Sequence, residues 1–564
     1  MKLIVKQWLR WLMICYRTRT IKERKMAVCR EWARWLALVA MMSLAGCGGA
    51  GAEKTARAAP EGASATVVPS VSREPATDAP APPHEYNAEQ VRQFLSAAKS
   101  AEAIKDPILR CMAYPDPPGS HWSRDTTTAY CHYHLQHVVS LAEIERLIRS
   151  GRTRELDQQL RRAQAQQGSP NTYGLLDETY KRDFSAPTAD LRMLLDRWKR
   201  ESPRSAFAFA ASGYAYVAEA SNARGRDRIR NTPQARLQTM DALVEKSEAD
   251  LHRAIELDPS ITPAYIALLS GANIARDGAY LEKVAQQAVK AVPDDYSVYS
   301  YLMVAVEPKW HGSLQLMKQV AALAQEHVEE NPLLRILLTE EPFYAVDNCR
   351  CSSAAQVSAY PAVFDQLSTS AHLARAGLVA RDNPGMALVY LSEALRFDPM
   401  APTAWKMTAE RSMRLTLAGE PRWGLAEADK VLDAHPDFAG AVKARALAFE
   451  KLGKIGLAES ALKRAAALDP TDIWSVAELG DLYISTNELD KAKSIADQLI
   501  RTHADDPRGW VMRASVQSVR YEPGLRETLH YFIAHFGNDP ALQATVAQMR
   551  AALAEEAKAN RDAK

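Results

Sequence analysis

Apolar and small residues recur every three or four positions along most of the chain, a pattern that predicts amphipathic α-helices. The stretch 438–470 is the clearest example, with two predicted helices joined by a turn at Lys451-Leu452-Gly453. The positions predicted to face the neighbouring helix are Val442, Ala446 and Phe449, then Leu457, Ala458, Ala461, Leu462 and Ala465. Pro470 ends the second helix because proline cannot donate the next backbone hydrogen bond. Such a hairpin cannot bury its apolar face alone, so the pattern predicts similar neighbours.

The prolines that end predicted helices test this interpretation, since repeated hairpins place small or apolar residues at fixed offsets before them. The prolines are Pro259, Pro293, Pro399, Pro436 and Pro470. The residues eight positions before these prolines are Leu251, Ala285, Leu391, Ala428 and Leu462. Those five positions before are Ala254, Ala288, Ala394, Val431 and Ala465. Those twelve positions before are Ser247, Leu281, Ala387, Gly424 and Ala458. All of these residues except Ser247 fit the repeat pattern. The spacing is 34 residues from 259 to 293 and again from 436 to 470.

This register resembles that of the tetratricopeptide repeat family, most clearly over residues 367–510. Leu479, Gly480, Tyr483 and Ala492 match the family pattern, as does Trp405. The resemblance implies a curved stack of helix pairs whose inner face binds extended peptides or other proteins. We therefore expect an all-α fold, an α-solenoid of stacked helical hairpins (tetratricopeptide-like) behind a disordered N-terminal tether.

Changes in composition and pattern predict the domain organisation. The predicted segments are a signal peptide (1–46), a lipidated cysteine with a flexible Ala/Pro/Ser-rich tether (47–86), a small Cys/His-rich segment (87–139), a helical domain with repeat-like hairpins (140–345), a loop or boundary (346–366), tetratricopeptide-like repeats (367–540) and a C-terminal capping helix (541–564). The tether has almost no large apolar residues, so it cannot bury enough surface to offset the entropy cost of ordering.

The N-terminus has the features of an export signal. Arg30 and Arg34 precede a short apolar run over 35–42, which is too short to span a membrane. The sequence Leu44-Ala45-Gly46-Cys47 resembles the bacterial lipobox, which implies cleavage before Cys47 and lipid attachment to it. Gly48 stands where that family has aspartate for inner-membrane retention, which implies outer-membrane anchoring facing the periplasm. Met26 is the predicted true start. The alternative is a cytoplasmic protein with an apolar helix near its start.

Charge argues against a nucleic-acid partner. The whole chain has 70 Lys and Arg against 68 Asp and Glu. Without the first 46 residues, 60 basic and 66 acidic residues remain. Sequence-independent nucleic-acid binding requires a basic surface, which a mildly acidic mature chain does not supply.

Four cysteines follow Cys47: Cys111, Cys131, Cys349 and Cys351. An even number in an exported protein indicates disulfides, and the simplest pairs are Cys111–Cys131 and Cys349–Cys351. The second pair encloses one residue, so we expect it to be strained, reducible and open to a redox role. The alternative is a zinc or copper site that uses Cys111, Cys131 and some of His121, His132, His134 and His137, although the spacing matches no zinc module.

The middle region resembles a bacterial domain family of unknown function over about 140–345. The resemblance rests on Trp198, Ser202-Pro203, Ala223-Arg224-Gly225, Leu257-Asp258-Pro259 and Pro308-Lys309-Trp310-His311-Gly312-Ser313. The family implies no activity. Arg224, Lys309, Trp310 and His311 are candidates for a shared binding groove. The alternative is that Trp310 and Gly312 form a packed turn before the next helix.

These observations favour a lipid-anchored envelope scaffold that binds protein partners through its repeats. The alternative is a metal-binding or thiol-redox protein that uses residues 111–137 and the Cys349–Cys351 pair. The sequence contains no G-x-S-x-G, H-E-x-x-H, phosphate-binding glycine loop or Rossmann fingerprint. We therefore expect no enzyme activity, no cofactor, no metal and no catalytic residues.

Overall fold

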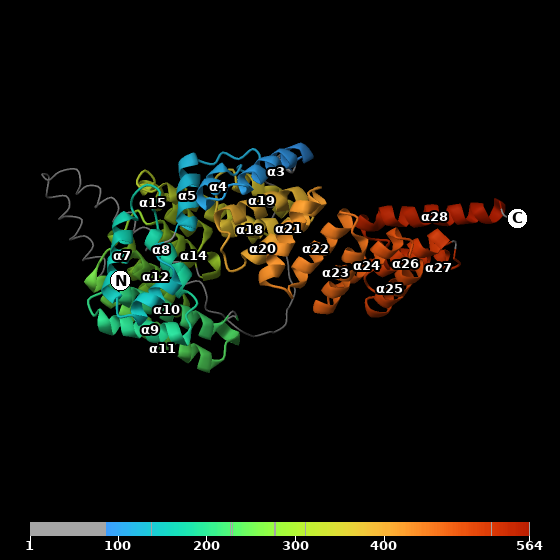
Figure 1. The fold of residues 1–564 in the computed structure, drawn as a ribbon. Helices are drawn as coiled ribbons and strands as arrows, with labels where there is room; N and C mark the ends of the chain where they lie inside the picture. The colour runs from blue at the N-terminus through green and yellow to red at the C-terminus, as the bar shows by residue number, and fades with distance from the viewer. Residues whose placement is uncertain are drawn as a thin grey trace, which may run out of the picture.

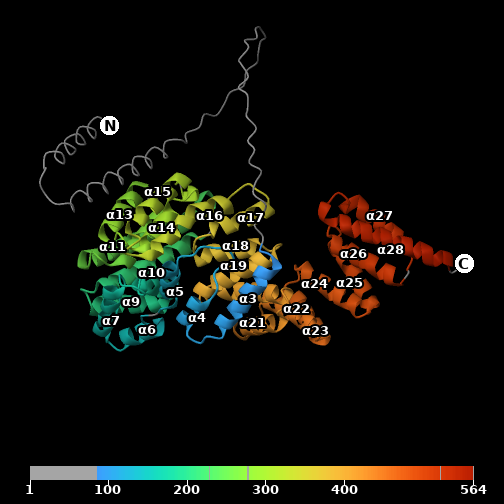
Figure 2. The same ribbon diagram turned by 90° about the horizontal axis from the view of Figure 1, so that it is seen from above.

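The computed structural model describes residues 86–562, except 137, 226, 228, 276, 277, 311 and 521. Every regular element in this part of the chain is a helix (Figure 1). The helices up to α21 gather into a broad body, and the later helices continue from it as a row that ends at the C-terminus (Figures 1 and 2). No described helix is both long enough and apolar enough to cross a membrane.

The broad body contains α3 (Ala88–Glu102), α4 (Pro107–Ala113), α5 (Arg124–Leu135), α6 (Leu141–Arg149), α7 (Thr153–Gln166), α8 (Leu175–Phe184), α9 (Ala189–Glu201), α10 (Ala206–Arg224), α11 (Gln234–Leu257), α12 (Thr262–Ala275), α13 (Gly278–Ala291), α14 (Tyr296–Ala305), α15 (Leu314–Ala324), α16 (Glu340–Asp347), α17 (Ser353–Val363), α18 (Ser370–Val379), α19 (Pro384–Phe397), α20 (Ala404–Leu417) and α21 (Pro421–Ala434). The row contains α22 (Ala439–Lys451), α23 (Ile455–Leu468), α24 (Ile473–Ser485), α25 (Leu489–Thr502), α26 (Pro507–Arg520), α27 (Leu525–Phe536) and α28 (Gln543–Asp562). Short 3-10 helices are η1 (Ile229–Asn231), η2 (Pro308–Trp310), η3 (Gln325–His327), η4 (Pro332–Thr339) and η5 (Pro540–Leu542).

Helices α22 and α23 form the hairpin predicted from residues 438–470. Gly453, in the turn between them, has a φ of +70°, which favours glycine. In α23, Ala458, Leu462 and Ala465 are buried at a spacing of four and three residues. Leu457 differs from the prediction, because it lies outside this stripe and its side chain is 50% exposed.

Most buried side chains of the broad body belong to one continuous hydrophobic cluster, and a small separate cluster contains Ala220, Met240 and Val244. A single cluster of buried side chains runs from Phe94 to Leu415, and separate clusters serve the row of hairpins, one of them from Ala446 to Val516. Helix α19 lies deep in the body, and all twelve residues from Met386 to Phe397 are buried. The core therefore extends across the predicted boundary at 346–366.

The N-terminal Cys/His-rich segment packs onto residues near α19, far away in sequence. The indole nitrogen of Trp122 donates to the carbonyl oxygen of Phe364 at 2.9 Å. Arg396 Nε donates to the carbonyl oxygen of Cys111 at 2.7 Å, and its guanidinium pairs with Asp116 at 2.8 Å. This segment is therefore an integral part of the broad body.

The range 346–366, predicted as a loop, contains α17. Ser352 caps this helix, because its side chain accepts a hydrogen bond from the backbone N–H of Ala355 at 3.2 Å. Pro361 lies inside the helix, and only Val357, Tyr360 and Val363 are buried. A proline and a weak apolar stripe conceal this helix in the sequence.

Candidate functional site

A hollow of about 560 Å³ lies between α18 and α20 and reaches Phe438 at the start of α22. Helix α18 contributes Ala371, Ala374 and Leu378 to its walls, and α20 contributes Thr403, Lys406 and Glu410. We call this hollow the α18–α20 groove. Its surface is mainly apolar: Leu378 is 43% exposed, and Met407 lines the groove from a largely buried position.

Helical spacing explains why these residues share one side of each helix. Ala371, Ala374 and Leu378 are separated by three and then four positions, as are Thr403, Lys406 and Glu410. The two helices begin 34 residues apart, at Ser370 and Ala404, so they are the first helices of successive hairpins. Alanine at 371 and 374 leaves space that a larger side chain would fill.

Charged and aromatic side chains also come together in the row of hairpins. Lys443 of α22 lies 5.8 Å from the ring centre of Trp474 in α24 and 3.4 Å from an Oδ of Asp472. Burial raises the pKa of Glu478 to about 7, and the neighbouring carboxylates of Asp481 and Glu450 add to this effect. Helices α22 and α24 therefore bring aromatic and charged side chains together outside the groove.

Charged residues of the broad body adjoin the α18–α20 groove at Asp398, which is also one of its walls. His134 Nδ1 lies 4.0 Å from an Asp398 carboxylate oxygen and 3.5 Å from Glu178 Oε2. Lys181 binds the other oxygen of Glu178 at 2.9 Å. Burial opposes ionisation of Glu178, but Lys181 and His134 outweigh it and hold the pKa of this carboxyl below its ordinary value.

The structure brings together part of the predicted group Arg224, Lys309, Trp310 and His311. The Arg224 guanidinium carbon lies 5.9 Å from the ring centre of Trp310, and Arg224 Nε and Trp310 Nε1 are buried without a hydrogen-bond partner within the described part. Lys309 instead pairs with Glu307 at 2.5 Å and is exposed. His311 lies outside the described residues. The packed turn is also present, since the N–H groups of Trp310 and Gly312 both bond the Glu307 carbonyl.

The cysteines and histidines of the predicted metal site have separate partners. Cys111 is disulfide-bonded to Cys131, and both are buried. His121 pairs with Asp365 at 2.5 Å, and His132 bonds the Gln136 side chain at 2.8 Å.

Among the residues that the structure describes, no group of three or more His, Cys, Asp or Glu side chains is arranged to hold a metal ion. His137 and Cys47 lie outside the described residues. Cys349 and Cys351 are bonded to each other on an exposed loop between α16 and α17, and a redox role for this pair stays a prediction.

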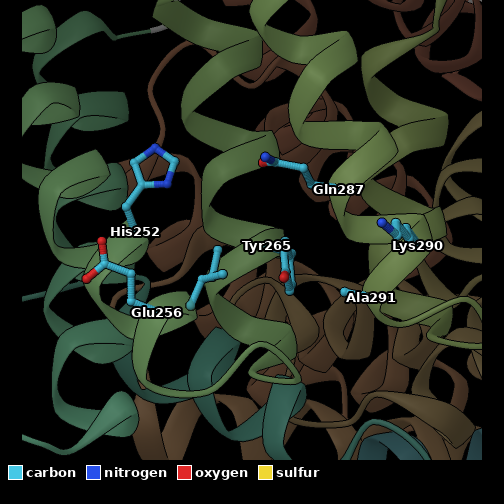
Figure 3. Close-up of a pocket in the computed structure, with 7 residues that line it drawn as sticks. His252, Glu256, Tyr265, Gln287, Lys290 and Ala291 are labelled. Carbon is cyan, nitrogen blue, oxygen red and sulfur yellow. The ribbon is translucent and has the colours of Figure 1, made fainter.

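A second hollow, of about 470 Å³, lies among α11, α12 and α13 (Figure 3). His252 and Glu256 come from α11, Tyr265 from α12, and Gln287 and Lys290 from α13. The Tyr265 hydroxyl already donates to the Pro259 carbonyl at 3.0 Å. Because its walls come mainly from second helices of hairpins, this hollow does not belong to the face that forms the α18–α20 groove.

The sequence predicted binding on the inner face of the repeats but did not identify the groove residues. Of the residues around Asp398, the sequence singled out His134 alone, as a candidate metal ligand. The groove depends on which helices pack together, and helical periodicity does not show this.

Stacked helical hairpins with a face shared between successive first helices define a helical-repeat protein of the α-solenoid class. Residues 450–516, from the end of α22 into α26, match the tetratricopeptide repeat family model. No curated protein matches the sequence significantly.

Similar solved structures include three helical-repeat chains. The TPR domain of P58(IPK) is 12% identical, with 65% of this chain and 94% of that chain covered and a TM-score of 0.20. Yeast Tom70 is 10% identical, with 74% of this chain and 95% of that chain covered and a TM-score of 0.30. The Cut9–Hcn1 hetero-tetramer of APC/C is 11% identical, with 72% of this chain and 95% of that chain covered and a TM-score of 0.25.

Proposed function

We propose that this chain is a scaffold that binds extended segments of partner proteins in the α18–α20 groove. We further propose that a lipid on Cys47 anchors it to the bacterial outer membrane, with the repeats facing the periplasm. In this proposal the scaffold recruits proteins and catalyses no reaction itself.

One observation supports the binding role most directly. Side chains of α18 and α20 form an open, mainly apolar groove in which Leu378 is 43% exposed. Removing apolar surface from water contributes about 25 cal/mol per Å², so an exposed leucine between small side chains favours an apolar partner residue. Exposed backbone and side chains of an extended segment can follow such a groove along successive repeats.

The test compares two leucines of similar exposure. Leu378→Asp places a charge in the groove and is expected to reduce in-cell cross-linking to partner proteins by about tenfold. Leu457→Asp is the matched control, because Leu457 is 50% exposed on α23, away from the groove. Equal cross-linking of both variants and the unchanged chain would overturn the groove as the binding site.

The membrane anchor rests on Leu44-Ala45-Gly46-Cys47 behind a short apolar run. A diacylated cysteine supplies stable membrane attachment, because two acyl chains bury enough CH₂ groups to resist dissociation. Cys47→Ala is expected to abolish fatty-acid labelling and to move the chain into the aqueous phase of a detergent partition. Persistence in the detergent phase would contradict lipid anchoring at this residue.

A further inference from the structure

Asp398 differs from the aspartates at equivalent turns of other hairpins. In the Leu-Asp-Pro turns, Asp258 Oδ1 accepts from the N–H of Ser260 at 2.9 Å, and Asp469 Oδ1 accepts from the N–H of Thr471 at 3.1 Å. The equivalent residue after Asp398 is Met400, and within the described chain the Asp398 carboxylate accepts no hydrogen bond. This aspartate is therefore not used to stabilise its own turn.

The Asp398 carboxylate instead lies on the wall of the α18–α20 groove, with 27% of its side chain exposed. The nearest basic atom is His134 Nδ1 at 4.0 Å, and His134 lies closer to Glu178. Lys181, the cation of this cluster, is already bound to Glu178. Among described residues, no lysine or arginine lies within 4.0 Å of Asp398, so its carboxylate has no partner with a permanent positive charge.

The other charged groups of the groove have partners or extend into solvent. Arg375 binds Asp347 at 2.9 Å, and Glu410 pairs with Arg414 at 3.7 Å. Lys406 is exposed and lies 5.0 Å from the Trp405 ring centre. Asp398 is thus the groove carboxylate that lacks a strong cationic partner.

A half-buried carboxylate beside apolar walls matches the chemistry of a long basic side chain. The stem of lysine or arginine packs on apolar surface while its charged head reaches an acidic group. Charge-assisted hydrogen bonds to a carboxylate are about twice as strong as neutral ones. Partial desolvation in the groove strengthens such a pair relative to one on an open surface.

We propose that Asp398 selects a lysine or arginine in the bound segment, next to an apolar residue that contacts Leu378. This inference rests on the proposed function of the α18–α20 groove. The selecting site is composite: Asp398 follows α19 of the repeats, whereas His134 and Glu178 come from α5 and α8.

The test uses the purified full chain and a randomised, end-blocked peptide library, with bound peptides identified by mass spectrometry. The unchanged chain is expected to enrich peptides in which lysine or arginine is close to leucine, isoleucine, methionine or phenylalanine. For one enriched peptide, Asp398→Asn is expected to weaken binding about tenfold and to remove the difference between the basic peptide and its glutamine analogue. Asp490→Asn is the matched control, because Asp490 is 90% exposed on α25, away from the groove, and pairs with Arg520 at 2.7 Å.

The outcomes separate the two proposals. Enrichment of apolar peptides without basic residues, abolished by Leu378→Asp, would overturn selection by Asp398 and leave the groove as a binding site. Enrichment of acidic peptides would overturn it as well. Binding unaffected by Leu378→Asp would overturn the groove as the binding site.

Thermal unfolding of the Asp398→Asn chain is expected to match that of the unchanged chain, since the carboxylate accepts no hydrogen bond. A lowered unfolding midpoint would assign Asp398 a structural role instead.

Discussion

At the residue scale, close approach of the backbone explains two glycines. A Cβ at Gly174, where φ is +63°, would overlap the ring of Tyr133, and a Cβ at Gly312 would overlap the carbonyl of Val306. Gly312 thereby allows the turn after α14 to fold back onto Glu307. The sequence predicted a turn here but not its backbone contact, because the contact depends on where the chain returns in space.

Gly312→Ala is expected to lower the free energy of unfolding by about 2 kcal/mol, because the new methyl group would displace the Val306 carbonyl. Gly456→Ala serves as control. A Cβ at Gly456, inside α23, meets no atom within 4 Å, so alanine is expected to stabilise the helix by about 0.5–1 kcal/mol. Urea unfolding followed by circular dichroism measures both changes, and a neutral Gly312→Ala would contradict the close approach.

At the element scale, helix bounds were largely predictable, and their long-range partners were not. The hairpin predicted from residues 438–470 corresponds to α22 and α23, which meet at the predicted turn. The association of α3–α5 with α19 rests on buried charges and backbone carbonyls, which leave no periodic signal in a sequence. Arg396 is the clearest case, because it pairs with Glu393 and Asp116 while its own helix has an apolar composition.

Arg396→Leu is expected to destabilise the fold by about 3 kcal/mol, because it leaves the buried Glu393 carboxyl and the Cys111 carbonyl without their hydrogen-bond donor. The matched variant is Lys99→Leu, which breaks an exposed pair with Glu420 and is expected to cost less than about 1 kcal/mol. Both Arg396 and Lys99 make contacts that join the N-terminal segment to distant helices. Similar costs in chemical denaturation would show that burial does not distinguish the two pairs.

The disulfide between α4 and α5 gives a second test at this scale. It closes a sequence separation of 20 residues, so replacing Cys111 and Cys131 by alanine is expected to cost about 3 kcal/mol. Replacing Cys349 and Cys351 by serine is expected to cost less than about 1 kcal/mol, because that bridge spans a separation of only two residues. Urea unfolding midpoints under non-reducing conditions compare the two variants. Equal losses of stability would contradict the expected difference between the two disulfides.

At the scale of the whole molecule, the repeat architecture followed from the sequence, whereas the extent of the core did not. Fixed offsets before prolines located α19, α21 and α23 because each hairpin uses the same local contacts. The continuous core from Phe94 to Leu415 joins segments with different patterns, so periodicity placed a boundary within it. One wall residue of the groove lies at this junction, since His134 of α5 approaches Asp398 to 4.0 Å from outside the repeats.

The buried carboxyl groups predict how stability depends on pH. Burial raises the pKa of Asp295 to about 6 and that of Asp177 well above its ordinary value of 3.8, and the nearby Asp295 carboxyl adds to the effect on Asp177. Burial likewise raises the pKa values of Glu340 and Glu393 to about 8. The folded chain therefore binds more protons at these groups than the unfolded chain, so their contribution to stability is full below about pH 4 and is lost as pH rises towards 8.

In the unchanged chain the free energy of unfolding falls between pH 5 and pH 8. In Asp177→Asn this fall is expected to be smaller by about 2 kcal/mol, because the amide cannot ionise beside Asp295. Asp437→Asn, at an 80% exposed side chain, is expected to leave the profile unchanged. Urea unfolding at half-unit pH intervals provides the measurement. A profile that keeps its slope in Asp177→Asn would exclude this pair as its source.

The N-terminal segment also determines when the broad body can fold during synthesis. Tyr86 bonds Tyr390 across 304 residues, and Glu102 pairs with Arg411 across 309. At about 5–20 residues per second, the ribosome needs about 15–60 s to supply these partners. During that interval the apolar faces of α3–α5 have no native surface to cover them, and they are then candidates for chaperone binding. A later hairpin such as α22–α23 can close as soon as its own thirty residues have emerged.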